Sequence, residues 1–257
     1  MRMNFRQKVR SIFTIGKPKL DFSNDTFIIA YPKSGITWLR WLIANYILNG
    51  QSDFIKTNEL IPDIHVDSHL VNLIKPPRII KAHYTYRNDI RKIIYVVRNV
   101  NDVVVSYYYF QIKYNFISED MPFEDFFHLF ISGKIWPGSW ESHVVGWLDN
   151  QPSDFLVVRY EDLKRNTRQE LLRVLTFLDF EIDNSRIELA IEASSFENMS
   201  RLEKLQKSAI PRNANSRDDI QFVRSGIIGD HLNYLTTRMN TQLLFRNRRG
   251  LRRLNYL

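Results

Sequence analysis

The 257-residue sequence predicts a single α/β domain with a central, mainly parallel β-sheet flanked by helices. Three observations predict this class. Short runs of apolar and β-branched residues alternate with segments of helical periodicity. The chain contains no internal repeat and no linker rich in Pro, Gly or Ser. Hydrophobic residues make up 44% of the chain, which is enough for one sizeable core.

Four short apolar runs are the candidate strands. The first, Thr26 to Ala30, reads TFIIA and leads into a Pro-Lys-Ser-Gly turn. The other three are Arg78 to Lys81, Ile93 to Val97 and Phe155 to Arg159. Runs of this length and composition are typical of strands that are buried on both faces of a parallel sheet.

Two helices are predicted behind the first and the last of these strands. After the first strand, apolar residues recur at helical spacing until Gly50 ends the pattern: Trp38, Leu39, Leu42, Ile43, Tyr46 and Ile47. After the last strand, Asn166 to Leu178 reads as a helix, with Asn166 as its N-cap. This alternation of strands and helices favours parallel strand connections.

Two segments allow two interpretations. Asp102 to Ile112 is rich in Val and Tyr, which favours a strand. Because the segment follows a strand and an Asn-Asp cap, we predict a helix instead. The polar residues 201–223 predict a long loop, which is either a lid or a solvated connection.

The basic charge is concentrated at the two ends of the chain. Residues 1–20 contain six Lys or Arg and no acid, and residues 246–257 contain five Arg and no acid. Since the whole chain has a net charge of +8, residues 21–245 carry a net charge of −3. We therefore predict a basic N-terminal extension (1–20), one domain (21–245) and a basic C-terminal tail (246–257). The two ends are either solvated or in peripheral contact with a membrane surface.

The composition excludes several classes of protein. Cysteine is absent, which excludes a disulfide scaffold, a thiolate nucleophile and a zinc site with Cys ligands. No apolar run reaches the length of about 18 residues that a membrane-spanning helix needs. The N-terminus lacks the apolar core of a signal peptide, so the expected location is the cytoplasm.

The turn from Tyr31 to Trp38 predicts an anion-binding site. It joins a strand to a helix, so that backbone N–H groups and the helix N-terminus converge on one point. Lys33 adds a positive charge, and Ser34 and Thr37 add hydroxyl groups. A plain tight turn is the alternative. The nucleotide-binding pattern G-x-x-x-x-G-K-[ST] is not matched, because the Lys precedes the Gly.

These eight residues, YPKSGITW, resemble the cofactor loop Y-P-K-S-G-T-T-W of the cytosolic sulfotransferases. The resemblance continues in chain order through YVVRNVNDVVVSYYYF (95–110), GKIWPGSWESHVVGW (133–147), RYEDLKRNTRQELLRVLTFL (159–178), SSFENM (194–199) and FVRSGIIGDHLNYLT (222–236). The resemblance implies the fold of that family. It also implies transfer of a sulfuryl group from 3′-phosphoadenosine 5′-phosphosulfate (PAPS) to a hydroxyl or amine of a small-molecule acceptor, with PAP as product and no metal.

The resemblance also implies the site residues. The 5′-phosphosulfate would contact the loop residues Lys33, Ser34, Gly35, Ile36, Thr37 and Trp38. The 3′-phosphate would contact Arg98, Ser106, Arg224, Ser225 and Gly226. The adenine would stack on Trp38 and Phe196, with Tyr160, Ser194 and Met199 nearby. The implied catalytic residues are His83 as general base, Lys33 at the leaving group, Lys81 at the sulfuryl group and Ser106 as a restraint on Lys33.

The chain departs from the family pattern at several positions. Ile36 replaces a Thr of the loop, and Ser225 replaces the Lys of R-K-G, so weaker PAPS binding is expected. His231 replaces the Trp of G-D-W. The family's dimer motif, K-x-x-x-T-V-x-x-x-E, is matched only at Thr236, which leaves the oligomeric state open.

Other patterns have simpler interpretations. His65 and His69 have a metal-ligand spacing, but no third ligand is evident, and a solvated or acceptor-facing helix is the preferred interpretation. We interpret His143 as structural or acceptor-side, and the run from Tyr107 to Phe110 as core and pocket wall.

Two further functions stay open as alternatives. The first is a P-loop nucleotide kinase or NTPase, which would require a Walker Gly-Lys-Ser/Thr and a magnesium-binding Asp. The second is a basic anion-binding protein without catalysis; because the excess charge is terminal, no nucleic-acid partner is expected. The acceptor itself cannot be read from the segments 50–75, 113–139 and 200–222.

Overall fold

The computed structural model describes residues 22–207 and 216–257. Four strands form one parallel sheet in the order β2-β1-β3-β4. The strands are β1 (Thr26–Ala30), β2 (Ile79–Ala82), β3 (Lys92–Val97) and β4 (Asp154–Arg159). The α/β class and all four predicted strands are therefore confirmed, each strand within one residue of its predicted ends.

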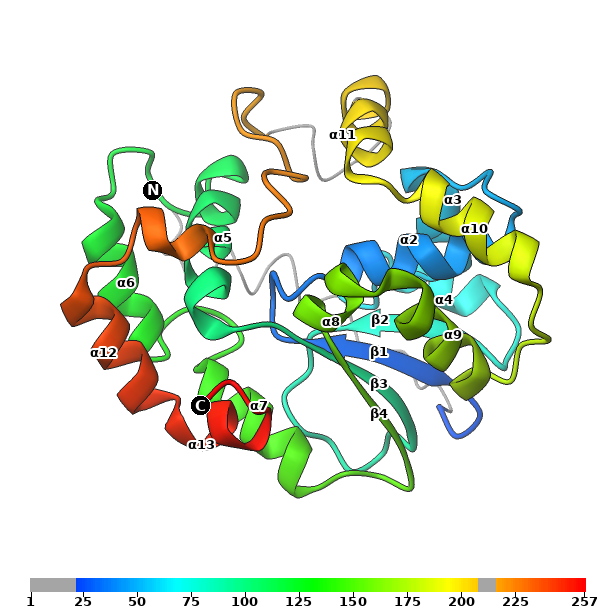
Figure 1. Ribbon diagram of the computed structural model, residues 1–257, viewed down its shortest axis with the longest axis horizontal. Helices are drawn as coiled ribbons and strands as arrows, with labels where there is room; N and C mark the ends of the chain where they lie inside the picture. Colours follow the sequence, from blue (N-terminus) through cyan, green and yellow to red (C-terminus); the bar gives the residue numbers. More distant parts are fainter. Residues whose placement is uncertain (1–21, 208–215) are drawn as a thin grey trace.

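Helices cover both faces of the sheet (Figure 1). On one face, side chains of β1 and β3 such as Ile28 and Ile94 are buried against α2 (Ile36–Ile47), α9 (Thr167–Phe177) and α10 (Asn184–Ala193). On the other face, alternate side chains such as Ile29 and Tyr95 are buried against α5 (Val100–Lys113), α6 (Phe123–Ile131) and α7 (Trp140–Asp149). Successive strand residues point to opposite faces, so both faces of the strands are apolar.

Further helices surround these two layers in the described part of the chain. They are α3 (Phe54–Leu60), α4 (Ser68–Leu73), α8 (Tyr160–Arg165), α11 (Phe196–Leu205), α12 (Thr237–Arg246), α13 (Arg248–Arg253) and the 3₁₀ helix η3 (Asp230–Asn233). The described ranges contain no helix that is long and apolar enough to cross a membrane.

The ambiguous segment 102–112 is a helix, as predicted. It belongs to α5, where the Asn99 side chain accepts a hydrogen bond from the backbone N–H of Asn101. Helical periodicity is weak in the sequence because the first turns of α5 are buried on nearly every side; Val103, Val104 and Val105 are all fully buried. The predicted helix after β4 is also present, and the Asn166 side chain caps α9.

The predicted loop over residues 201–223 is wrong in its first part. Helix α11 extends to Leu205, because Ser195 caps its start and Met199 and Glu203 are buried on its inner face. Residues 208–215 lie outside the described ranges. Residues 216–223 lie between α5 and α11 (Figure 1). Lys113 of α5 donates hydrogen bonds to the backbone carbonyls of Arg217 and Ile220, and Glu203 of α11 accepts the backbone N–H of Phe222.

The basic C-terminal stretch is folded. The predicted boundary at residue 245 lies inside α12, and α13 packs on α7 through the fully buried Leu251. Glu141 of α7 accepts hydrogen bonds from the backbone N–H groups of Arg249 and Gly250. The arginines of this stretch are all exposed. The predicted basic extension 1–20 lies outside the described residues.

Candidate functional site

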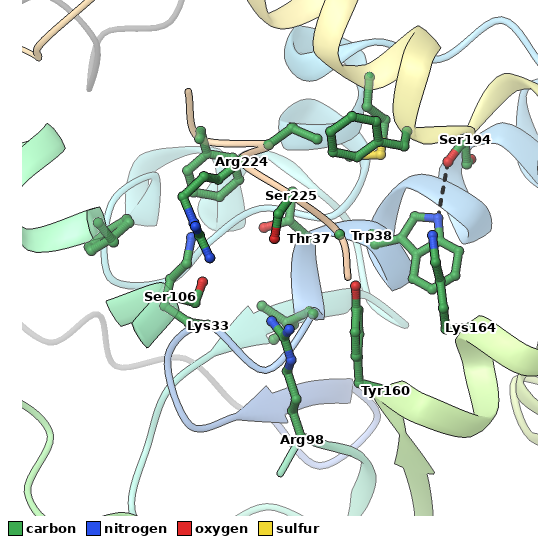
Figure 2. Close-up of a pocket in the computed structure, with 18 of the residues that line it drawn as sticks. Lys33, Thr37, Trp38, Arg98, Ser106, Tyr160, Lys164, Ser194, Arg224 and Ser225 are labelled. Atoms are coloured by element: carbon green, nitrogen blue, oxygen red, sulfur yellow. Dashed lines mark hydrogen bonds between the residues drawn. The ribbon is translucent and has the colours of Figure 1, made fainter. Parts of the chain in front are cut away.

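A cavity of about 400 Å³ lies at the carboxyl ends of the four strands. Parallel sheets typically bind ligands at this edge. The cavity is lined by every predicted site residue except Ser34. Figure 2 shows Trp38, Lys164 and Ser194 on one side of the cavity, and Lys33, Ser106 and Arg224 on the other.

The loop between β1 and α2 forms one wall of this cavity. Lys33 and Gly35 have left-handed backbones, with φ of 70° and 95°. Gly35 is required for a second reason, because a Cβ at this position would collide with the ring of Tyr160. No side chain caps the first turn of α2, and that turn contains no acidic residue. Its N–H groups and positive dipole end therefore remain available to an anion.

Ser34 and Ile36 differ from the expectation that the loop side chains face the donor. Ser34 is fully buried, its hydroxyl has no hydrogen-bond partner among the described residues, and the side chain does not line the cavity. Ile36 lines the cavity but is 3% exposed and belongs to the core cluster under α2. Ile36 therefore offers the cavity mainly its backbone, whereas the backbone N–H of Ser34 donates to the Tyr31 carbonyl at 3.3 Å.

The ammonium group of Lys33 lies between two aromatic rings. Its Nζ is 4.8 Å from the ring centroid of Phe110 and 4.2 Å from that of Phe222. Burial, together with the weaker effect of the neighbouring charges of Arg98 and Lys81, lowers the pKa of Lys33 to about 7. Ser106 lines the same cavity, and its predicted restraint on Lys33 stays a prediction.

Two arginines define a second cationic group in the cavity. The guanidinium of Arg98 lies 4.4 Å from the ring centroid of Tyr160 and donates a hydrogen bond to the Ile227 carbonyl at 2.9 Å. Its Nε is buried without a partner in the described ranges. Arg224 is paired with Asp230 and lies 4.6 Å from the ring centroid of Tyr109. Ser106, Ser225 and Gly226 line the cavity near these two cations.

An aromatic slot occupies the other side of the cavity. The indole N–H of Trp38 donates a hydrogen bond to the Ser194 carbonyl at 3.0 Å, and its ring meets that of Tyr160 edge-on at 5.9 Å (Figure 2). Phe196 and Met199 of α11 complete this part of the lining. A slot of this kind accepts a flat aromatic ring.

The sequence analysis missed two lining residues that lie beside the predicted site residues, Lys164 and Phe222. Lys164 lies 5.5 Å from the Trp38 ring centroid, and its Nζ is 3.9 Å from where a Cβ at Gly226 would stand. Lys164 follows Tyr160 by four residues on α8, so helical spacing could have indicated it. Phe222 gave no such signal, because its position depends on the path of residues 216–223.

His83 and Lys81 lie at the end of β2. The Nδ1 atom of His83 is 2.7 Å from the Ala30 carbonyl, which can only accept, so Nδ1 carries the proton and Nε2 is the free basic atom. Burial holds the pKa of His83 well below its usual range, and the charge of Lys81 lowers it further. Lys81 is 5% exposed and forms an ion pair with Asp63 at 2.7 Å.

The three other histidines named in the sequence analysis, His65, His69 and His143, lie in different surroundings. The Nε2 atom of His65 accepts the backbone N–H of His83 at 3.0 Å, whereas His69 is exposed. His143 is buried in the core beside Tyr95, and burial lowers its pKa to about 3. Within the described ranges, no group of three His, Asp or Glu side chains could hold a metal ion.

Tyr107 is buried and Phe110 lines the cavity, as predicted for the aromatic run.

Comparison with known proteins gives consistent matches. The model of the "Sulfotransferase domain" family matches residues 23–248. Sulfotransferase 1E1 of Bos taurus is 30% identical over 235 residues, covering 84% of this chain and 80% of its own length. Sulfotransferase 1 family member D1 of Mus musculus is 31% identical over 232 residues, covering 83% and 78%.

Solved structures with the same fold are more distant in sequence. Mouse sulfotransferase SULT7A1 complexed with PAP matches with a TM-score of 0.67 at 23% identity, covering 89% of this chain and 85% of its own. Retinol dehydratase in a complex with retinol and PAP matches with a TM-score of 0.74 at 18% identity, covering 96% and 85%.

Proposed function

The chain belongs to the sulfotransferase domain family, whose members transfer sulfur-containing groups, and we propose that its donor is PAPS and its product PAP. We propose further that the acceptor is a small molecule that presents a hydroxyl or an amine. Two structures of the same fold are described as complexes with PAP, which supports the choice of donor.

The cavity carries this proposal, because its lining matches the two anionic ends of the donor. Five cations line it: Lys33, Lys81, Arg98, Lys164 and Arg224. Among the described lining residues, Glu197 is the sole acid. The loop before α2 suits the 5′-phosphosulfate, and Arg98 and Arg224 suit the 3′-phosphate, since a guanidinium binds phosphate with two parallel hydrogen bonds. The slot beside Trp38 suits the adenine ring.

The reaction follows from the atoms that face the cavity. His83 Nε2 accepts the proton of the acceptor, whose oxygen or nitrogen forms a bond to sulfur as the bond between sulfur and the 5′-phosphate oxygen breaks. Negative charge then develops on that bridging oxygen, where the Lys33 ammonium stabilises it. An ammonium group can balance this charge, so the proposal needs no metal ion.

The surroundings of His83 favour an acceptor with an apolar or aromatic body. The ring of Trp136 lies 5.8 Å from that of His83, and Tyr84 follows His83 directly in the chain. Phe110 extends the apolar lining toward Lys33. Flat aromatic surfaces beside the base would orient a phenol or another hydrophobic alcohol.

A binding and turnover experiment tests the proposal. We expect PAP to raise the melting temperature, and label to pass from [35S]PAPS to a panel of phenols and hydrophobic alcohols. Stabilisation by ATP with magnesium but not by PAP would favour a nucleotide kinase or NTPase instead. Stabilisation by duplex DNA alone would favour an anion-binding protein without catalysis.

A further inference from the structure

Residues 62–65, which precede α4, run alongside β2. This segment contacts Lys81 and His83, the two proposed catalytic residues at the end of that strand. The backbone N–H of Lys81 donates to the Pro62 carbonyl at 2.9 Å, and that of Ile64 donates to the Lys81 carbonyl at 3.0 Å. Asp63 and Lys81 thus form an isolated parallel bridge at the open edge of the sheet. In this register the tripeptide Asp63-Ile64-His65 lies beside Lys81-Ala82-His83.

The side chains of this segment connect the two tripeptides. Asp63 accepts a hydrogen bond from Lys81 Nζ at 2.7 Å through one carboxylate oxygen. The other oxygen accepts the backbone N–H of His65 at 3.0 Å. His65 in turn accepts the backbone N–H of His83 through Nε2 at 3.0 Å. Every link uses a different donor and acceptor, so the four residues form one continuous network.

The ring of His65 also fixes the plane of the His83 ring. The two imidazoles are stacked, with an interplanar angle of 15° and ring centroids 6.1 Å apart. Trp136 meets both rings edge-on, at 5.3 and 5.8 Å. Because the Ala30 carbonyl holds Nδ1 of His83, Nε2 is left to act as the base, and His83 lines the cavity.

We propose that Asp63 and His65 are positioning residues for the transfer reaction: Asp63 holds the Lys81 ammonium, and His65 holds the backbone and ring of His83. This inference rests on the proposed function. The carboxylate also balances the charge of Lys81, which would otherwise oppose protonation of His83 more strongly. Lys81 and His65 lower the pKa of His83, and Asp63 raises it.

The protonation states of the histidine rings in the wild-type protein test the geometry without any measurement of activity. An acceptor role requires His65 Nε2 to be unprotonated, and the Ala30 contact requires His83 to carry its proton on Nδ1. Long-range 1H–15N spectra of the histidine rings should show both states at neutral pH, with His65→Gln used to assign its signals. A proton on His65 Nε2 at neutral pH would overturn the proposal.

Variants at position 65 separate positioning from simple structural support. His65→Phe keeps a flat ring but loses the acceptor, so we expect kcat to fall about 10–100-fold. His65→Gln keeps an acceptor oxygen and should restore most of kcat. The exposed His69 provides the control, since His69→Phe should leave kcat unchanged. Equal kcat in His65→Phe and wild type would contradict the role, as would equal losses in kcat and PAP affinity.

The Asp63→Asn variant removes the charge while keeping the shape of the side chain. We expect kcat to fall about tenfold, and the acid limb of the kcat–pH profile to move to lower pH, because Asp63 raises the pKa of His83. Glu59→Gln, an exposed change nearby, is the control. An unmoved acid limb would show that Asp63 is only structural. If wild-type enzyme transfers nothing from PAPS, the proposed function fails, whereas the ring spectra still decide the geometry.

Discussion

The two ends of the cavity are built in different ways. The donor end is made of turns that directly follow strands or start helices: Lys33 to Trp38 follow β1, Arg98 follows β3 and Tyr160 starts α8. The acceptor end combines β2 with a segment that precedes it by some 15 residues and with Trp136 from a distant loop. Local sequence therefore determines the part of the donor end that follows the strands, to which α11 and the turn at 224–226 are added by tertiary contacts, whereas tertiary pairing determines the whole environment of the base.

Removing the base should give the largest loss of activity. It should lower kcat, which depends on the acceptor end, without changing the binding of PAP at the donor end. We expect His83→Ala to lower kcat by about 10²–10⁴-fold, the usual contribution of general base catalysis, while PAP affinity changes less than twofold. Stopped-time assays with [35S]PAPS and calorimetric titration with PAP measure the two quantities. The exposed His128 offers a matched control, and His128→Ala should retain full activity. Full activity in His83→Ala would exclude its role as base.

The fold was predictable where the sequence carries a local signal. The strands are short β-branched runs, and the turn after β1 combines Lys33 with a glycine at a left-handed backbone position. Helix α5 required topology as well, because burial on nearly every side removed its periodicity. Helix α11 was missed because its exposed face is polar, which resembles a loop.

The site was less predictable wherever a contact joins distant segments. Lys164 belongs to the donor end only because α8 brings it beside Trp38 and Gly226. Ser34 belongs to the matching motif, yet it is fully buried and does not line the cavity. The spacing of His65 and His69 favoured a solvated or acceptor-facing helix over a metal site. His65 instead precedes α4, and its contact with the His83 backbone depends on the pairing of this segment with β2.

A change at the donor end should have the opposite signature to that of His83→Ala. Arg224→Gln removes a cation near the proposed 3′-phosphate, and a lost charged hydrogen bond costs about 1.5–3 kcal/mol. We therefore expect PAP affinity to fall about 10–100-fold, with kcat at saturating donor nearly unchanged. Arg238→Gln on the exposed face of α12 is the control. An unchanged dissociation constant for PAP would remove Arg224 from the donor site.

The two ends should also respond differently to pH. Lys33 has a pKa of about 7, and a bound anion would favour its charged form. PAP binding thus takes up a proton above that pH, so its affinity should fall by up to about tenfold per pH unit as pH rises from 7. The limb of the kcat/KM profile that reports His83 in the free enzyme should lie well below 6.5, because burial lowers the pKa of His83.

Calorimetric titrations in two buffers of different ionisation enthalpy measure that proton uptake directly. Lys33→Arg should abolish it, because a guanidinium stays charged throughout this range. Proton uptake that persists unchanged in Lys33→Arg would assign the titration to another group, for example a phosphate of PAP itself.

The smallest expected effect concerns the family lysine that Ser225 replaces. Ser225→Lys should tighten PAP binding only about twofold to fivefold, since an added ion pair in a partly open site contributes little and Lys164 already lies beside the same turn. If Lys164 substitutes for the missing charge, Lys164→Gln should weaken PAP binding more in the wild type than in Ser225→Lys. Additive effects in this double-mutant cycle would show that the two positions contact different parts of the donor. An unchanged affinity for PAP in Ser225→Lys would show that charge at this turn does not limit binding. Any weakening of donor binding relative to the family pattern would then be assigned to the loop around Ile36.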